Sequence, residues 1–227
     1  AEFVYGPFTD DHDWVLRLKK RLDERIESHG GDHIIRLTLY REQARGLIST
    51  GLISVDDLKI HLSLSHLDLN LSEDKMLSLR TCMAPMRPAW WPDYLKVGDY
   101  LPTILAQRMC MQPGDDDVLF VNPKDMVLAT SVSNFFMVRD NTLYTAPTGP
   151  NVLAGTMRKK VIHEARHFFD GIKECHFTVS QLFKSDCFFG TNAIRGPFLI
   201  DKIDNHQIKY SHDFLIKFEA FRKRVLV

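Results

Sequence analysis

Two kinds of hydrophobic pattern fill the first part of the chain. In residues 11–29 apolar side chains recur at roughly helical spacing, acidic residues open the stretch and Gly30 follows it, which predicts an amphipathic helix. Apolar and polar residues then alternate in three short stretches, each typical of a strand: residues 35–39, 60–64 and 77–83. One helix and three strands predict a small α/β domain at residues 1–84.

A proline-rich segment interrupts this pattern. The stretch APMRPAWWPD contains Pro85, Pro88 and Pro92, and so many prolines in a short stretch cannot continue a helix. We therefore expect a semi-rigid linker at residues 85–94 and a second domain at residues 95–227.

Predicted strands dominate the second domain. Helical periodicity is limited to residues 100–111, 155–169 and 211–225. Short apolar runs predict strands elsewhere, at residues 117–121, 126–130, 134–139, 143–145, 187–192 and 197–203. Asp140-Asn141 is typical of a hairpin turn. This irregular alternation of strands and helices favours an α+β arrangement over a doubly wound sheet.

Composition and charge narrow the choice of partners. The 227 residues are 44% hydrophobic, which suits a globular protein, and 29 Lys and Arg balance 29 Asp and Glu. A chain without net charge has no field to attract nucleic acid or an anionic membrane, so we expect a small-molecule partner. No apolar run approaches the roughly 20 residues of a membrane helix, and the first residues lack the pattern of a signal peptide. We expect a cytoplasmic protein.

Two further features concern the cysteines and the start of the chain. Cys82, Cys110, Cys175 and Cys187 are far apart and form no Cys-x-x-Cys motif, so we expect reduced core cysteines rather than disulfides or a zinc site. The sequence begins with Ala1 instead of Met. We therefore expect the natural N-terminus to be absent from it, and the first domain to lack its opening segment.

One motif indicates a metal peptidase. His163, Glu164 and His167 form H-E-x-x-H on a predicted helix, which places two imidazoles one turn apart beside a carboxylate. The extended H-x-x-G-x-x-H pattern fails, because Gly171 is four residues after His167 instead of three. A third ligand is left open at Glu219. We interpret the motif as one face of a solvated helix and expect no metal.

A second set of motifs covers most of the chain in a fixed order. A lysine is followed by a Tyr-Leu segment, S-x-S-N-x-F, Leu-Tyr-Thr, Leu-x-Gly-x-x-Arg and Thr-Asn before a strand. These are Lys96 with Asp99–Leu101, Ser131–Phe135, Leu143–Thr145, Leu153–Arg158 and GTNAIRGPFLIDKID at residues 190–204. Over roughly residues 12–204 the set resembles the class IV aminotransferases and their relative aminodeoxychorismate lyase.

The resemblance implies an architecture and a cofactor. It implies the two-domain fold type IV of pyridoxal phosphate (PLP) enzymes, a small α/β sandwich domain plus a larger pseudo-barrel α/β domain with PLP between them. It also implies a homodimer whose partner subunit contributes to the active site. Lys96 would hold PLP as a Schiff base and shuttle protons, since a lysine desolvated in a cleft can do both.

The cofactor-binding residues also follow from the resemblance. Gly155, Thr156 and Met157 open a predicted helix, whose free N–H groups suit a phosphate. The family's Thr-Asn segment carries over to Thr191 and Asn192, with Ala193 beside them as a substrate contact. Leu153 would pack on the pyridine ring. Tyr100 either reaches the cofactor's phenolic oxygen or belongs to the core.

Arginines are the candidates for the substrate carboxylate and for a further phosphate contact. Arg45-Gly46 resembles the Arg-Gly of the family's substrate loop, so Arg45 is the first candidate and Arg41 the second; a solvent-facing loop arginine is the alternative for both. Arg17 occupies the place of the family's phosphate-binding arginine, although Trp14 replaces the histidine of the family's His-x-x-Arg-Leu. A surface arginine is the alternative reading there.

One departure from the family bears on catalysis. Ala129 stands where relatives have a glutamate that keeps the pyridine nitrogen protonated. We expect slow turnover, a substitute group or loss of activity.

The function that we predict is amino transfer between an amino acid and a 2-oxo acid. Aminodeoxychorismate lyase is the first alternative, because Gly155-Thr156-Met157-Arg158 is somewhat closer to its phosphate turn. A catalytically impaired relative is the second.

Overall fold

The computed structural model describes residues 12–29, 33–41, 58–66 and 75–227. The chain forms two compact units, Ala1–Asn70 and Leu71–Val227. In the first unit, helix α2 (His12–His29) precedes strands β1 (His33–Arg41) and β2 (Leu58–His66). The two strands pair antiparallel with Leu37 opposite Leu62. The helix and both strands predicted in this region are confirmed.

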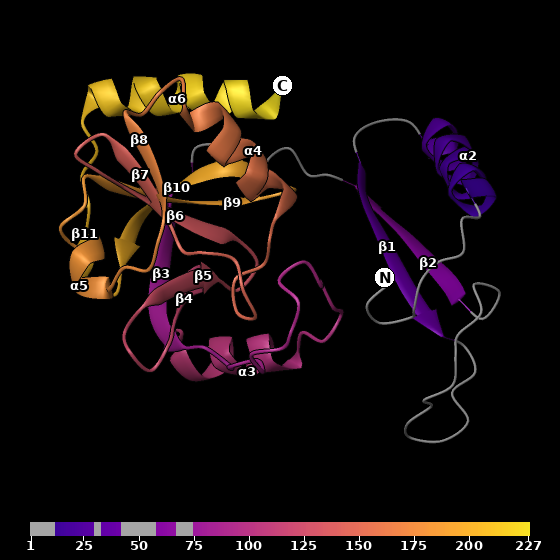
Figure 1. Ribbon diagram of the computed structural model, residues 1–227, viewed down its shortest axis with the longest axis horizontal. Helices are drawn as coiled ribbons and strands as arrows, with labels where there is room; N and C mark the ends of the chain where they lie inside the picture. Colours follow the sequence, from indigo (N-terminus) through magenta and orange to yellow (C-terminus); the bar gives the residue numbers. More distant parts are fainter. Residues whose placement is uncertain (1–11, 30–32, 42–57, 67–74) are drawn as a thin grey trace. The chain divides into compact units, whose positions relative to one another are not determined.

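The second unit is built around a nine-stranded sheet (Figure 1). Its strands are β3 (Leu77–Met83), β4 (Asp117–Val121), β5 (Val127–Thr130), β6 (Asn134–Arg139), β7 (Thr142–Thr145), β8 (Gly171–Glu174), β9 (Cys187–Asn192), β10 (Gly196–Ile203) and β11 (His206–Gln207). The sheet closes on itself, because β9 pairs with both β6 and β10 while β10 also pairs with β3. The resulting barrel and its helices confirm the predicted mixed α/β fold.

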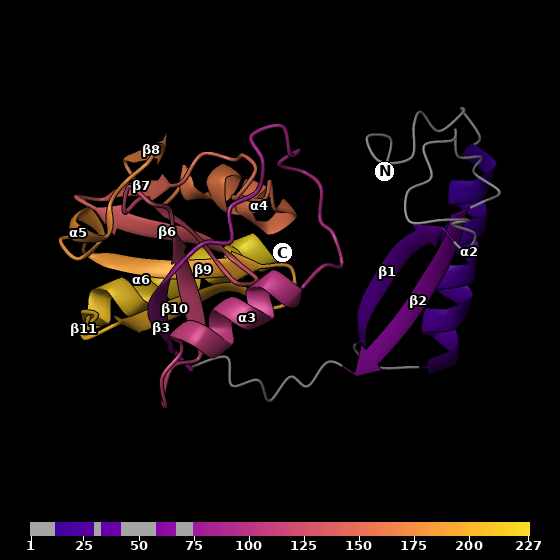
Figure 2. The same ribbon diagram turned by 90° about the horizontal axis from the view of Figure 1, so that it is seen from below.

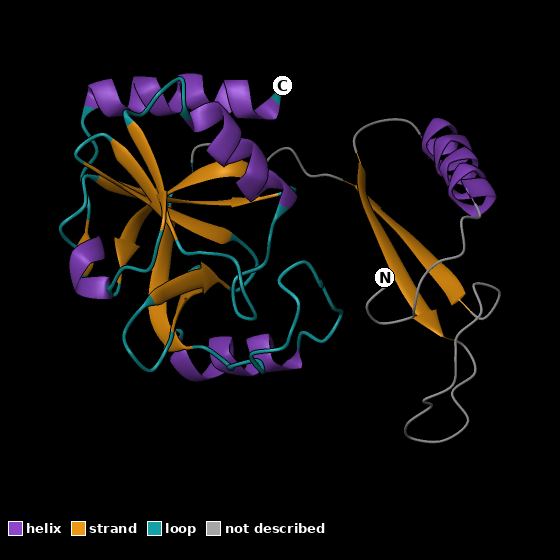
Figure 3. Ribbon diagram, in the orientation of Figure 1, coloured by secondary structure: helices purple, strands orange, loops and turns teal. Residues whose placement is uncertain are grey.

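Helices lie on the outside of this barrel. They are α3 (Leu101–Cys110), α4 (Thr156–Ala165), α5 (Val179–Leu182) and α6 (His212–Leu226). Figures 1 and 3 show α4 and α6 on one side of the strands and α3 on the opposite side; Figure 2 shows the unit from below, with α3 seen from its side. No described helix is long and apolar enough to cross a membrane.

Paired phenylalanines explain why the strands read as unbroken apolar runs. Phe135 and Phe188 belong to one buried cluster of the barrel, whereas the adjacent Phe136 and Phe189 belong to another, beneath α4 and α6. Phe136 and Phe189 stack with ring centroids 5.1 Å apart. A strand that is buried on both faces needs apolar side chains at every position. The cluster beneath α4 and α6 therefore fixes both helices to the barrel wall.

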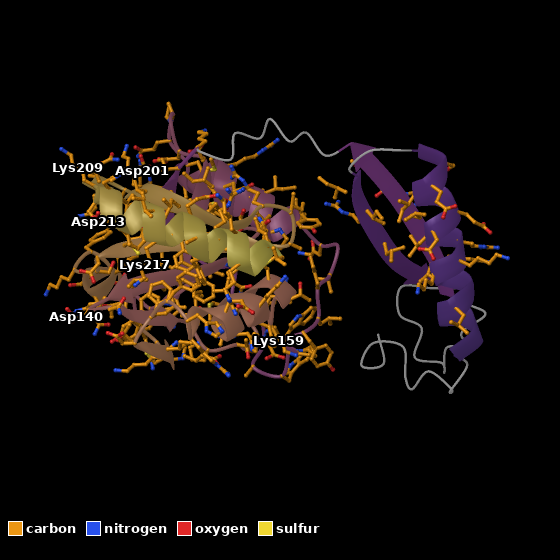
Figure 4. All side chains as sticks on the ribbon, turned by 90° about the horizontal axis from the view of Figure 1, so that it is seen from above. Asp140, Lys159, Asp201, Lys209, Asp213 and Lys217 are labelled. Atoms are coloured by element: carbon orange, nitrogen blue, oxygen red, sulfur yellow. A yellow bond between two sulfur atoms is a disulfide. The ribbon has the colours of Figure 1, made fainter. Side chains whose placement is uncertain are left out.

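The closing helix is also attached through a lysine. Lys217 of α6 donates to Asn141 Oδ1 at 2.6 Å, and its Nζ lies 4.7 Å from the centre of the Phe169 ring. Figure 4 shows Lys217 on the same side of the unit as Asp140. Asp140 and Asn141 have φ of 50° and 52°, the left-handed conformation of a tight hairpin. The predicted turn is confirmed.

The domain boundary differs from the one we expected. Strand β3 pairs in parallel with β4 and with β10, so it belongs to the barrel and not to the first unit. The division falls between Asn70 and Leu71, ahead of the proline-rich segment. Helix α4 is also shorter than predicted, since it ends at Ala165 and Arg166 caps it.

Two cysteines overturn the expectation of reduced thiols. Cys82 of β3 and Cys110 of α3 form a disulfide with their Cα atoms 5.9 Å apart. The sequence did not indicate this pair, because the two cysteines are 28 positions apart and only the packing of α3 on β3 brings them together. Cys175 and Cys187 are free. Burial raises the pKa of the Cys187 thiol far above its usual value, which keeps it protonated.

Candidate functional site

A pocket of about 370 Å³ opens in the second unit. This size is typical of sites for small molecules and cofactors. Its walls come from the segment before α3, the β5–β6 turn, the start of α4 and the end of β9. Nine predicted site residues line it: Lys96, Tyr100, Leu153, Gly155, Thr156, Met157, Thr191, Asn192 and Ala193. The fold therefore brings together residues that are nearly 100 positions apart along the chain.

The three predicted arginines are not among these lining residues. Arg17 lies in α2 and Arg41 ends β1, both in the first unit. Arg45 lies outside the described residues. Their assignments stay predictions.

One end of the pocket is suited to an anion. Helix α4 begins at Thr156. Its N-cap residue is Gly155, which has no side chain to cap the N–H groups of the first turn. The free N–H groups and the positive end of the helix dipole attract a negatively charged group there. A Cβ atom on Gly155 would lie 2.2 Å from Asn134 Oδ1, so a larger residue at this position would force Asn134 or the start of α4 to shift.

Asn134 shapes this end of the pocket, although the sequence did not single it out. Its Nδ2 donates to the Leu153 carbonyl at 2.8 Å, which ties the start of β6 to the turn before α4. Across the sheet it pairs with Thr191 of β9. The S-x-S-N-x-F motif contained Asn134 and was the signal for it.

Thr191 supplies an unused hydroxyl. The residue is 1% exposed, and its Oγ1 is buried without a hydrogen-bond partner among the described residues. A buried polar atom of this kind is rare unless a ligand or water completes it. The neighbouring Asn192 is engaged, since its Nδ2 donates to Ser133 Oγ at 3.0 Å and its Oδ1 accepts from the amides of Ile194 and Arg195. Thr191 therefore offers a donor, whereas Asn192 shapes the turn.

Lys96 lies on the segment between the proline-rich stretch and α3. Its side chain is exposed rather than desolvated, and Nζ lies 5.9 Å from the centre of the Tyr100 ring. A hydrogen bond of 2.8 Å from the Ala154 amide to the Asp93 carbonyl holds this segment against the turn before α4. Within the described part of the chain, no carboxylate pairs with the Lys96 amine. The amine is available to a ligand in the pocket.

The wall formed by β5 lacks a charged group. Ala129 lines the pocket and pairs with Asn134, so a methyl group occupies the position at which the resemblance led us to expect a carboxylate. Close by, Ser131 accepts a hydrogen bond of 3.1 Å from Gln107 Nε2, and Gln107 also donates to Asp117. The carboxylates that do line the pocket, Asp93 and Asp99, belong to the segment that carries Lys96.

Arg87 is a lining residue that the sequence analysis missed. It lies within the proline-rich segment, which we had interpreted only as a linker. Its guanidinium carbon is 4.9 Å from the centre of the Trp91 ring, and its backbone N–H donates to Asn151 Oδ1 at 2.8 Å. The signal that the sequence offered for it was the position of a charged residue between Pro85 and Pro88.

The glutamate of the H-E-x-x-H motif takes part in the packing of α4 against α6. Glu164 of α4 forms an ion pair with Arg224 of α6, and this hydrogen bond lowers the pKa of Glu164. Glu219, the open third ligand, pairs with Arg222 and Lys223 on its own helix. In the described ranges, no group of three or more His, Cys, Asp or Glu side chains could hold a metal ion.

Comparison with known proteins identifies the family. Residues 10–203 match the family model "Amino-transferase class IV". The branched-chain-amino-acid aminotransferase 5, chloroplastic, of Arabidopsis thaliana is 28% identical over 121 residues, which are 52% of this chain and 29% of that protein. A probable branched-chain-amino-acid aminotransferase of Rickettsia typhi is 29% identical over 96 residues, 42% of this chain and 33% of that protein. The matched regions thus cover about a third of these relatives.

Solved structures agree on the fold. A branched-chain aminotransferase from Thermoproteus uzoniensis has a TM-score of 0.79 at 23% identity, covering 93% of this chain and 71% of that one. A putative 4-amino-4-deoxychorismate lyase from Legionella pneumophila has a TM-score of 0.77 at 24% identity, covering 96% and 79%. Together with the family model, which spans most of the chain, these likenesses establish that the protein belongs to the class IV aminotransferase family.

Proposed function

We propose that this protein is a PLP-dependent aminotransferase that moves an amino group between an amino acid and a 2-oxo acid. One observation carries the proposal: the pocket joins the available amine of Lys96 to an anion site of the family's type, made of the α4 N-terminus and the unpartnered Thr191 hydroxyl. A cofactor that has both an aldehyde and a phosphate fits such a pair of features.

The residues present fit this cofactor at two of its three contact points. The N–H groups of Thr156 and Met157 would hold the phosphate, with Thr191 Oγ1 as a further donor. Lys96 would bind the aldehyde, and Leu153 would pack on the ring. The third point is the ring nitrogen, for which Ala129 offers no hydrogen bond.

The cofactor, when bound, supplies an aldehyde that links covalently to amines and a ring that withdraws electrons from the adjacent carbon. Lys96 Nζ would be the base that takes the proton from the α-carbon of the amino acid and returns it elsewhere. The anion site and the packing of Leu153 would keep the reacting carbon within reach of this amine. A 2-oxo acid would then accept the amino group by the reverse steps.

The cofactor proposal is tested by attachment chemistry. Purified protein supplied with PLP is expected to turn yellow, and borohydride reduction followed by peptide mapping is expected to place the pyridoxyl group on Lys96. Lys96→Ala is expected to abolish both signals. Lys124→Ala is the matched control, because Lys124 lies on the β4–β5 turn and does not line the pocket. Protein that stays colourless with added PLP would contradict the proposal.

The lyase is a second candidate, favoured by Gly155-Thr156-Met157-Arg158 at the start of α4. In that reaction Lys96 would drive the loss of pyruvate from aminodeoxychorismate and leave 4-aminobenzoate. Pyruvate released without any amino acceptor would identify the lyase. Amino transfer predicts instead that product forms only when a 2-oxo acid is present.

We further propose that the protein acts in the cytoplasm as a homodimer. The exposed apolar face of α3 supports the dimer, since Met109 is 83% exposed and Leu101, Ile104 and Leu105 are exposed beside it. A contiguous apolar surface of this kind is typical of a protein interface.

A further inference from the structure

Among the described residues that line the pocket, one cation is present besides Lys96. Among its lining residues, Lys96 and Arg87 carry a positive charge and Asp93 and Asp99 a negative one. In the proposed function Lys96 is committed to the cofactor. Arg87 is then the remaining positive group of the lining that can meet a negatively charged substrate.

Arg87 is held in position from two directions. Its guanidinium stacks over Trp91, with 4.9 Å between the guanidinium carbon and the ring centre. Its backbone N–H donates to Asn151 Oδ1 at 2.8 Å, which anchors the segment to the loop before α4. A guanidinium stacked on an aromatic ring keeps its in-plane N–H donors free. The side chain is therefore oriented while its hydrogen-bonding edge stays available.

Three other arginines of the same unit have carboxylate partners. Arg80 forms two hydrogen bonds to Asp115, Arg158 pairs with Glu174 at 2.7 Å, and Arg224 pairs with Glu164. Among the described residues, no carboxylate pairs with Arg87, whose side chain is exposed. A fixed arginine at a pocket wall without an acidic partner is suited to a carboxylate from solution.

We propose that Arg87 binds the carboxylate of the substrate and sets the requirement for one. The inference rests on the proposed function and adds to it the residue by which the pocket would distinguish amino and 2-oxo acids from amines, amides and aldehydes. Asp93 and Asp99 add to this selection. Their negative charges repel a substrate carboxylate from their own part of the wall and so favour its binding at Arg87. The role of Arg87 does not depend on Arg45 or Arg41 of the first unit.

Binding of unreactive, achiral acids separates recognition from chemistry. The probes are 4-methylpentanoate, 3-phenylpropanoate and glutarate, each compared with its neutral amide or diamide, and the protein is the PLP-loaded form. Calorimetry is expected to show that the wild type binds at least one acid tightly and its amide roughly tenfold or more weakly, as for the loss of a charged hydrogen bond. Arg87→Met is expected to remove this preference, and Arg87→Lys to restore part of it.

Matched controls exclude indirect effects. Arg108→Met removes an exposed arginine of α3 that does not line the pocket, and it is expected to leave the preference unchanged. Trp91→Phe keeps a ring beneath Arg87 and is expected to retain most of the preference, since Trp91 Nε1 has no hydrogen-bond partner among the described residues. Trp91→Leu is expected to weaken it. With amino acid substrates, Arg87→Met should raise KM more than it lowers kcat.

The outcomes distinguish this inference from the proposed function. If Arg87→Met carries the pyridoxyl label on Lys96 and still prefers acids as strongly as the wild type, the inference is wrong and the proposed function stands. A wild type that binds no acid more tightly than its amide also overturns the inference. If no label forms on Lys96 in any variant, the proposed function itself fails.

Discussion

At the scale of single residues, Gly155 tests the anion site most directly. Gly155→Ala places a methyl group against Asn134 Oδ1, and the side chain or the α4 N-terminus must move. We expect roughly tenfold weaker binding of PLP, the effect of disturbing about one hydrogen bond to a charged group. Fluorescence titration of the cofactor-free protein measures the affinity.

Gly149→Ala is the control for this variant. Gly149 also lines the pocket, but a Cβ atom there would have nothing within 4 Å. Equal affinities for PLP in the two variants would show that the start of α4 does not hold the phosphate.

Ala129 concerns the rate rather than the attachment of the cofactor. A carboxylate at this position would accept a hydrogen bond from the protonated ring nitrogen and so keep the ring positively charged. Ala129→Glu is therefore expected to raise kcat by about tenfold or more, measured as 2-oxo acid formed. Ala129→Gln has a similar size without the charge and is expected to give no increase. An unchanged kcat in the Glu variant would mean that another group, or no group, serves the ring nitrogen.

At the scale of elements, the disulfide ties the Lys96 segment at both of its ends. Cys82 precedes the segment and Cys110 ends the helix that follows it, so the bond closes a loop that contains Lys96. A closed loop of this length stabilises the fold by about 3.6 kcal/mol through the unfolded state. Cys110→Ser is expected to lower the free energy of unfolding by that amount in urea titrations.

The control for this element is Cys175→Ser, since Cys175 is free. A reductant should destabilise the wild type and leave Cys110→Ser unaffected. If reductant changes neither protein, the two cysteines are not bonded in solution.

The elements also show what a sequence can and cannot predict. Alternating or unbroken apolar runs identified seven of the nine strands of the sheet, most clearly the buried strands β4 and β6. The short strands β8 and β11 were missed, because their residues, Gly171–Glu174 and His206–Gln207, are at most half-buried and carry no clear pattern. The place of β3 was misjudged, because its partner β10 is more than 100 residues away and alternation says nothing about pairing.

The residues of the candidate site, like the strands, were predicted only in part. Ordered motifs located Lys96, Gly155 and Thr191, since each has a backbone or chemical reason to be a particular residue type. Arg87 gave no comparable signal, because only the stacking on Trp91 and the pocket wall distinguish it from a solvated arginine.

At the scale of the whole molecule, the apolar face of α3 predicts self-association. Ile104→Lys introduces a charge there and is expected to convert the dimer to a monomer in light scattering, because a buried lysine without a partner is costly. Ile216→Lys is the matched control, an exposed isoleucine on α6. A wild type that is monomeric at all concentrations would contradict the proposed dimer.

The closed barrel has a consequence for the order in which the protein is made. Of the barrel strands, β3 to β6 leave the ribosome first, and their outer edges stay open until β9 and β10 pair with them. Thr191 arrives only with β9, so a nascent chain that already contains Lys96 and the start of α4 still has an incomplete anion site. The newly made chain therefore becomes able to retain its cofactor in the same step that removes its two exposed, aggregation-prone strand edges.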